Sequence, residues 1–434
     1  MRKKSVVRLI SAVMSVLLIM ISCVACSNNE EKSSSDKETI SIWAHDTSAY
    51  AAQKAVDLYL ANHPDCKYEF DVQDIGQENM VNKINLYLST NSLDDLPDMF
   101  YDEEYNFCKY TKYYTDAFMD LSNYVSADDF PICDYLNMCY DDKPYAVPFD
   151  CSTGALFYRI DLVSQAGYSK EDMTNLTWPE YIEIGKAVKA ATGVDMIVAC
   201  VDKAMETSLM VHSAATWYCD ENGIPNIENN TAFSDVLHTY KSLFDADIVY
   251  PASGFNDYIY AISNNEVASL VGAAWWPSVI QEYKEQSGLW RVAEMPRMVG
   301  SSNYTNYSCG ASGSWYVLNK ENREFVAEFT KEMFVESQEL ADYMATEYLI
   351  CPLNINLSEN LCSAKSEFFG NQDVLAFFTE CNKKIPSVKY GLNTYELTSC
   401  VANGISKYLD GSLTEEAALA QMQDDAERVV EQYE

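Results

Sequence analysis

The feature that most constrains the fold of this chain is residues 144–193, where an extended stretch leads into a capped helix. Residues 145–158 alternate apolar and small side chains without a helical stripe, which is typical of extended backbone. Thr177 and Glu180 then stand at the spacing of a capping box, and Gly193 stands where a left-handed residue would end the helix. The stretch predicts a crossing between two domains, followed at once by a helix.

The length of the chain supports two domains. At 434 residues, the chain exceeds the roughly 250–300 residues at which single cores stop growing. Strand patterns at 40–42, 68–72 and 96–100 alternate with amphipathic helix patterns, an order that predicts a mainly parallel sheet. Ligands of such sheets bind at the carboxyl ends of the strands, here 43–46 and 101–103.

The formal net charge of −35 limits the partners of the chain. Such a surface repels nucleic acid and anionic lipid headgroups, so we expect no nucleic-acid binding and a neutral ligand. The 31 Tyr and 7 Trp residues can fill cores, but aromatic rings are also the surfaces on which sugars stack. We interpret the acidic pair Glu103 and Glu104 as a solvated turn.

The N-terminus has the pattern of an exported lipoprotein. Four basic residues precede the apolar run 9–21, which is too short for a membrane span and typical of a signal peptide. The following Val-Ala-Cys-Ser resembles a lipobox, which predicts a signal peptide over 1–25 and a lipid on Cys26. Residues 20–23, which end at Cys23, form a weaker competing box. Residues 26–38 then form a polar tether.

Neither the cysteines nor the histidines point to a cofactor. Beyond the N-terminal region, the 12 remaining cysteines of the 14 form no C-x-x-C pair, and we interpret most of them as small buried hydrophobic residues. The histidines show no metal-binding spacing; they are His45, His63, His212 and His238. We therefore expect no metal and no cofactor.

Several segments together resemble the extracellular solute-binding proteins of carbohydrate ABC transporters. They are a Y-x-x-P segment from Tyr145, then F-Y-R-I-D-L, A-G-Y and T-W-P-E-Y. The family usually has Asn at the position of Arg159. The resemblance implies an α/β, two-lobed, periplasmic-binding-protein-like fold (Venus flytrap), each lobe a mainly parallel sheet flanked by helices, joined by hinge crossings. It implies a first lobe of 39–147 plus 309–355, and a second lobe of 148–308 plus 356–434.

The same resemblance nominates site residues. The segment 265–277 resembles the family's strand that delivers an aromatic residue to the cleft, and adjacent residues on a strand point to opposite faces. We therefore expect one of Trp275 and Trp276 to stack on ligand and the other to pack in the lobe. The glycine-rich stretch 308–318 nominates Trp315, and Trp217 fits a core or a cleft equally well. The complete candidate set is Trp43, Asp46, Tyr101, Asp102, Asp150, Trp217, Trp275, Trp276 and Trp315.

These observations predict a monomeric binding lipoprotein that captures a neutral oligosaccharide and delivers it to the permease subunits of an ABC transporter. A secreted glycoside hydrolase is the main alternative, because two carboxylates flanking a sugar would suffice and the chain has many. The tether and the double crossing favour the binding protein, since a hydrolase needs neither. Another cell-surface glycan-binding or adhesive lipoprotein would carry repeats or a low-complexity stalk, and the sequence has none beyond the short tether.

Overall fold

The computed structural model describes residues 37–200, 205–220, 222–361 and 365–433. Residues 40–64 and 70–433 form one compact unit, and residues 37–39 and 65–69 are grouped separately. The predicted signal peptide and Cys26 lie outside the described residues. None of the described helices is both long and apolar enough to cross a membrane.

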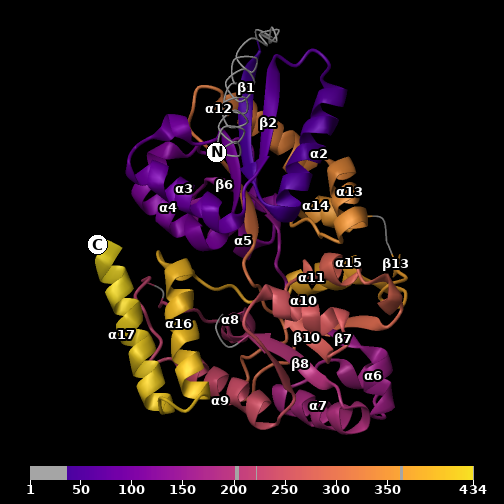
Figure 1. Ribbon diagram of the computed structural model, residues 1–434. Coiled ribbons are helices and arrows are strands. Elements are labelled where there is room, and N and C mark those ends of the chain that lie inside the picture. The colour runs from indigo at the N-terminus through magenta and orange to yellow at the C-terminus, as the bar shows by residue number, and fades with distance from the viewer. Residues whose placement is uncertain (1–36, 201–204, 221, 362–364, 434) are drawn as a thin grey trace, which may run out of the picture. The chain divides into compact units, whose positions relative to one another are not determined.

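The first lobe is built on a five-stranded sheet in the order β2-β1-β3-β12-β6 (Figure 1). Its strands are β1 Glu38–Ala44, β2 Tyr68–Asp74, β3 Met99–Glu103, β6 Ala146–Asp150 and β12 Gly313–Val317, with a small hairpin of β4 Cys139–Tyr140 and β5 Lys143–Pro144. The associated helices are α2 Asp46–Asn62, α3 Gln77–Ser89, α4 Phe107–Tyr114, α5 Ile132–Asn137, α12 Arg323–Thr330, α13 Gln338–Tyr348 and α14 Ile355–Glu359. Met80 and Tyr110 pack with Phe100 and Tyr316 of the sheet in one buried core.

The second lobe is built on another five-stranded sheet, in the order β11-β7-β10-β8-β9. Its strands are β7 Ala155–Arg159, β8 Asp195–Cys200, β9 Val249–Ala252, β10 Val267–Gly272 and β11 Trp290–Glu294, with the short pair β13 Lys365–Ser366 and β14 Gln372–Asp373. Its helices are α6 Ile160–Gln165, α7 Trp178–Thr192, α8 Met205–Ser213, α9 Thr231–Asp245, α10 Phe255–Ser263, α11 Trp276–Ile280, α15 Val374–Asn382, α16 Thr394–Leu409 and α17 Glu415–Tyr433.

Helices cover both faces of this second sheet. Along β7, Leu156 and Tyr158 belong to the core formed with α7 and α9, whereas Ala155 and Phe157 belong to the core formed with α10 and α15. Successive residues of a strand point to opposite faces, so both faces of β7 are buried. This explains why the strand reads as an apolar run.

The helix predicted from the capping box is confirmed as α7. The Thr177 backbone N–H donates to Glu180 Oε2 at 2.8 Å, and the Glu180 N–H donates to Thr177 Oγ1 at 3.4 Å. Gly193 ends the helix with a φ of 78°, a conformation that favours glycine. The local sequence alone therefore sets both ends of the helix.

Both sheets are mixed rather than mainly parallel, which corrects the expectation from the sequence. β1–β3, β8–β9 and β8–β10 are parallel, but β12 runs antiparallel to both β3 and β6, and β7 runs antiparallel to both β10 and β11. Parallel neighbours need a long crossover connection, usually a helix. β7 and β12 instead follow directly from the segments that pass between the lobes, so no helical crossover fixes their direction.

Candidate ligand-binding site

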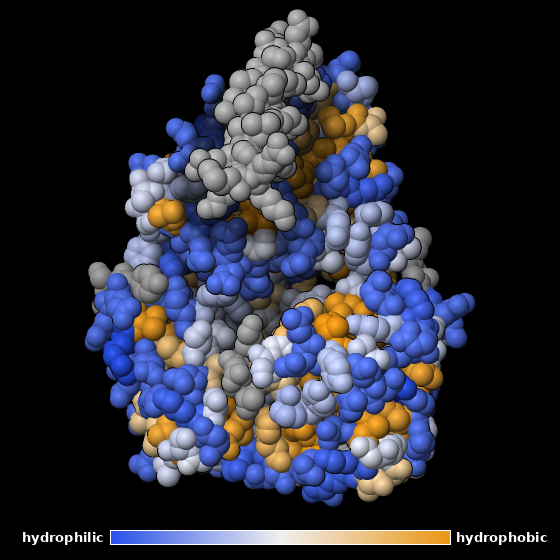
Figure 2. Space-filling model, in the orientation of Figure 1, coloured by the Kyte–Doolittle hydropathy of each residue, from blue (hydrophilic) through white to orange (hydrophobic). Residues whose placement is uncertain are grey.

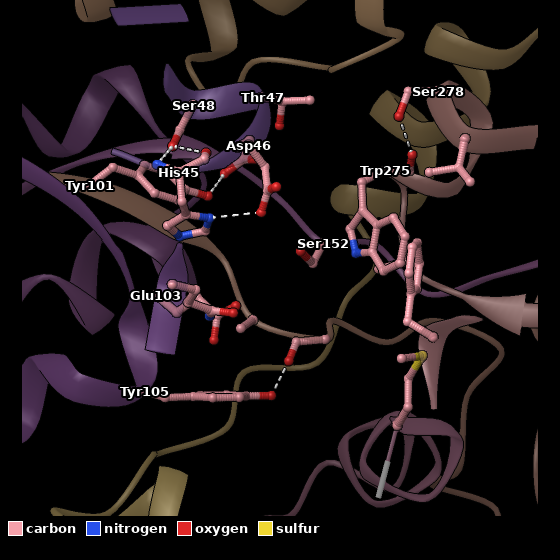
Figure 3. Close-up of a pocket in the computed structure, with 18 of the residues that line it drawn as sticks. His45, Asp46, Thr47, Ser48, Tyr101, Glu103, Tyr105, Ser152, Trp275 and Ser278 are labelled. Atoms are coloured by element: carbon pink, nitrogen blue, oxygen red, sulfur yellow. Dashed lines mark hydrogen bonds and ion pairs between the residues drawn. The ribbon is translucent and has the colours of Figure 1, made fainter. Parts of the chain in front are cut away.

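An open cleft with a volume of about 870 Å³ lies where strand ends of the first sheet meet the β10–α11 turn of the second. The first lobe contributes residues that follow β1, β3 and β6, and the second contributes Trp275 and Ser278. In Figure 3 the Trp275 indole lies on the opposite side of the cleft from His45, Glu103 and Tyr105. The volume falls within the range of about 300–1,000 Å³ that is usual for ligand pockets.

His45 and Asp46 form the junction between β1 and α2. Ser48 Oγ donates to the His45 carbonyl at 2.6 Å and holds the first turn of the helix, while His45 Nδ1 lies 3.2 Å from Asp46 Oδ2. Burial lowers the pKa of His45, but the hydrogen bond and charge of Asp46 outweigh it, so the pKa is raised overall. The Asp46 side chain is 86% exposed. It therefore offers an exposed carboxylate to the cleft, with one oxygen held by His45.

The second ring nitrogen of His45 has unmet hydrogen-bonding capacity. Nε2 is buried and has no partner among the described residues, which is unfavourable for a polar atom removed from water. The His45 ring packs edge-on against Tyr101 with centroids 5.2 Å apart. His45 is thus a further candidate for ligand contact, next to the exposed carboxylate of Asp46.

Tyr101 of β3 and Asp150 of β6 form a hydrogen-bonded pair on the first-lobe side of the cleft. The Tyr101 hydroxyl donates to Asp150 Oδ1 at 2.8 Å, and burial raises the pKa of Asp150 despite this bond. Gly313 of β12 makes the arrangement possible, because a Cβ there would overlap the Tyr101 hydroxyl. The pair presents one carboxylate whose orientation is fixed by the tyrosine.

The charge of the cleft is negative. Its lining includes the carboxylates of Asp46, Asp74, Glu103 and Asp150, and contains no Lys or Arg among the described residues. Burial, with the negative charge of Asp102, raises the pKa of Glu103 to about 7. Carboxylates accept hydrogen bonds, so the cleft suits a ligand rich in hydroxyl donors and disfavours an anion. Across the described residues, no group of three or more His, Cys, Asp or Glu side chains could hold a metal ion.

The second lobe contributes an aromatic wall. Trp275 is half-buried and lines the cleft, and it stacks on the buried Trp276 with ring centroids 4.6 Å apart and an interplanar angle of 24°. Trp276 occupies space that exists because residue 272 is glycine, since a Cβ there would overlap the indole. The exposed Phe255 flanks Trp275 at 6.0 Å. One indole is thus available to ligand and is supported from behind by the other.

The comparison with known families decides the identity of this two-lobed protein. The model for bacterial extracellular solute-binding proteins matches residues 54–368. The chain belongs to this family. The solute-binding protein therefore works outside the cytoplasm.

Relatives of this solute-binding protein bind sugars. The lactose-binding protein of Rhizobium radiobacter is 29% identical over 385 residues, covering 88% of this chain and 90% of the relative. The GacH receptor of Streptomyces glaucescens, solved without ligand and with acarbose, has a TM-score of 0.76 at 17% identity, covering 92% of this chain and 100% of that one. The lacto-N-biose complex of a Bifidobacterium longum ABC-transporter binding protein has a TM-score of 0.74 at 18% identity, covering 92% and 98%. The two solved structures show a shared fold.

Four of the nine nominated residues line the cleft of the solute-binding protein. They are Asp46, Tyr101, Asp150 and Trp275. The other five are buried outside it; they are Trp43, Asp102, Trp217, Trp276 and Trp315. Of the adjacent tryptophans, Trp275 is the one at the cleft and Trp276 the one in the core.

Asp102 lies away from the cleft because it follows Tyr101 on the same strand and points to the opposite face of β3. There its carboxylate accepts hydrogen bonds from the Tyr110 hydroxyl at 2.7 Å and from Asn106 Nδ2 at 3.0 Å. Burial raises its pKa. The side chain ties β3 to the following turn and helix.

The remaining tryptophans fill hydrophobic cores. Trp315 pairs with Tyr101 across the β3–β12 ladder and packs on Phe334 at 4.5 Å. Trp217 stacks on Tyr218 at 4.4 Å, and Trp43 is 8% exposed within the core of the first lobe. In each case the large apolar surface is buried by neighbouring rings, which leaves no face for a ligand.

The prediction of a solvated turn at Glu103 and Glu104 is wrong. Glu103 lines the cleft, and Glu104 is 2% exposed. Glu104 Oε1 accepts from the Ser312 N–H at 2.9 Å and Oε2 accepts from Asn137 Nδ2 at 3.0 Å. Burial, with the charge of Asp134, raises the pKa of Glu104 to about 8. Hydrogen bonds from two distant segments compensate for the burial of this acid.

Sequence reasoning missed several cleft residues. The strand-end rule could have found His45, which lies within the predicted strand end 43–46 beside Asp46. Ser152 and Gly310 lie in the segments that pass between the lobes, and Met205 and Phe255 belong to second-lobe helices. No local pattern marks these four, because only the packing of the lobes brings them to the cleft.

Proposed function

We propose that this solute-binding protein captures a neutral oligosaccharide between its two lobes for an ABC transporter. One observation carries the proposal: an indole, Trp275, faces a wall of carboxylates across a cleft whose described lining has no Lys or Arg. A pyranose ring has an apolar C–H face that stacks on aromatic rings and a rim of hydroxyl donors that carboxylates accept. The sugar ligands of the relatives support this choice.

Capture follows from lobe closure. Ligand held by both walls binds the closed form more tightly than the open form, and this differential affinity shifts the population toward closure. We propose that the first hinge crossing is 151–154, supported by the end of β6 at Asp150 and the start of β7 at Ala155. We place the second crossing at 308–312 and assign 349–354, which pairs with the end of β6 through Asp150 and Pro352, as the third hinge segment. The short helix α14 that follows it still packs on α13 of the first lobe. The closed form is then the one that the permease subunits recognise.

We further propose that the mature protein is a monomer held to the outer face of the cell membrane by a lipid on Cys26. The charged start, the short apolar run and the polar tether support this anchor. Mass spectrometry of the N-terminal peptide should find a diacylglyceryl mass on Cys26. A lipid on Cys23 would move the site, and a free amine on an unlipidated residue would contradict the anchor.

Binding without turnover is the expected result for the purified protein. Calorimetric titration with lactose, lacto-N-biose and acarbose should identify at least one ligand, and overnight incubation followed by chromatography should return each sugar intact. Hydrolysis that scales with protein concentration would favour the glycoside hydrolase, since the cleft contains several carboxylates. Failure of a wider panel of neutral saccharides to bind would contradict the proposed ligand class.

A further inference from the structure

Buried cysteines lie on all three segments that we assign to the hinge. Cys151 follows β6, Cys309 lies shortly before β12, and Cys351 follows α13. The three are 8%, 4% and 6% exposed. A single buried cysteine acts as a small hydrophobic residue. Here, however, each of the three hinge segments carries one, so the thiols lie where the backbone must change when the lobes move.

Two of these thiols are neighbours. Cys151 Sγ lies 3.6 Å from Cys309 Sγ. Their segments are joined by an antiparallel bridge between Thr153 and Cys309: the Gly154 N–H donates to the Ser308 carbonyl, and the Gly310 N–H donates to the Ser152 carbonyl, both at 2.8 Å. This ladder holds the two sulfurs side by side. A disulfide is about 2.0 Å long, so the sulfurs would have to approach by about 1.6 Å, a shift within the reach of side-chain rotation.

The surroundings distinguish this pair from the other hinge thiol. Cys351 Sγ lies 3.1 Å from the Thr379 hydroxyl, which turns it toward α15. The Cys151–Cys309 pair lies directly beneath the cleft, because the adjacent residues Ser152 and Gly310 both line it. Cys151 is the more exposed of the two residues, so a small oxidant in the cleft would meet it first.

We propose that Cys151 and Cys309 form an oxidation site, in which a low-molecular-weight disulfide converts the two thiols to a disulfide bond that fastens two hinge crossings together. The Cys151 thiolate attacks one sulfur of the small disulfide, forming a mixed disulfide and releasing one small thiolate, which takes up the Cys151 proton. The Cys309 thiol then loses its proton and attacks Cys151 Sγ, and the second small thiol leaves. Two protein thiols are oxidised and one small disulfide is reduced to two thiols.

The link would restrain closure because domain closure is absorbed by dihedral changes in a few hinge residues. Joining residues 151 and 309 limits the dihedral changes that the two crossings can make when the lobes rotate. A protein whose closed form is less populated has a proportionally weaker apparent affinity. Oxidation would therefore lower the apparent affinity for ligand without changing any residue that contacts the ligand.

The test begins with a peptide map, which needs no sugar. Full-length protein treated with diamide, which accepts the two hydrogen atoms of a dithiol, should yield a 151–309 crosslinked peptide that dithiothreitol abolishes. Hydrogen exchange of the amides at 152–155 and 308–311 should slow at least ~10-fold in the oxidised protein and recover on reduction. Cys151→Ser treated identically should show neither change, and Cys351→Ser is the matched control that should behave as wild type.

Two results would overturn the proposal: a map in which Cys151 or Cys309 links to Cys351 or Cys381 instead, or no link while the thiols of the unfolded protein oxidise. A link with unchanged hydrogen exchange would overturn the hinge restraint. If a serine variant fails to fold, Cys151→Ala serves in its place.

A second experiment, which rests on the proposed function, titrates lactose into the reduced and the oxidised protein. Binding should be about tenfold weaker after oxidation. Absence of lactose binding in both forms would count against the sugar assignment, while the peptide map would still decide the oxidation site.

Discussion

Replacing Trp275 with alanine should lower the affinity for the saccharide by a factor of about ten to a thousand, because a desolvated aromatic contact contributes on the order of a few kcal/mol to binding. The indole is half-buried at the cleft and lies flat on Trp276, so the core beneath it fixes its orientation. Since one face is already exposed, its removal should change the melting temperature little. Calorimetric titration and thermal melting of the variant measure the two effects separately.

Trp276→Ala is the matched control, because the neighbouring residue has the same side chain with the opposite environment. Trp276 is fully buried against Gly272 and Tyr258, and truncation of such a ring costs about 3–5 kcal/mol of stability. The affinity of the folded fraction of this variant should fall less than that of Trp275→Ala, because Trp276 supports the indole of Trp275 but does not line the cleft. Loss of stability without loss of affinity in Trp275→Ala would show that Trp275 is a core residue and that the ligand binds elsewhere.

Local sequence signals predicted the parts of the fold that depend on neighbouring residues. The capping box at Thr177 and the glycine at 193 set both ends of α7. The strand-end rule likewise predicted cleft positions at 43–46 and 101–103, and Asp46 and Tyr101 both lie there. These predictions succeed because helix caps and the ends of strands depend on residues close together in the chain.

The side of a strand on which the cleft lies could not be predicted in the same way. Tyr101 and Asp102 are neighbours that point in opposite directions, and the choice between them depends on how β3 pairs with β12, a strand more than 200 positions later in the chain. Trp315 is buried for the same reason, because the register that places it beside Tyr101 also covers it with Phe334. Pairing over such distances leaves no local trace in the sequence.

Charge was also misleading as a guide to exposure. An acidic run after a strand usually forms a solvated turn, yet Glu104 is buried and receives hydrogen bonds from Ser312 and Asn137. Neither partner is near it in sequence. Hydrophilic residues dominate the face shown in Figure 2, whereas Glu104 is 2% exposed.

Stability should fall as the pH rises from about 6.5 to 8.5. Burial raises the pKa of Glu103 and Glu206 to about 7 and that of Glu104 to about 8, whereas a glutamate in the unfolded chain titrates near 4.3. The folded state therefore binds more protons than the unfolded state in this window, and the free energy of unfolding decreases with pH. The raised pKa of His45 acts in the same direction. Burial lowers the pKa of His212 to about 3, which opposes the trend only below about pH 6.5.

Glu104→Gln should flatten this pH dependence, because glutamine keeps the shape of the side chain and stays neutral at every pH. Its carbonyl can still accept from the Ser312 N–H, and the variant should lose on the order of 1–2 kcal/mol less stability than wild type between pH 6.5 and 8.5. Urea unfolding at several pH values measures the slope, with Glu416→Gln, at an exposed position of α17, as the control that should leave it unchanged. A wild-type protein that becomes more stable across this window would mean that the buried glutamates are already ionised at pH 6.5. Hydrogen bonds, and not protonation, would then offset the cost of burying these glutamates.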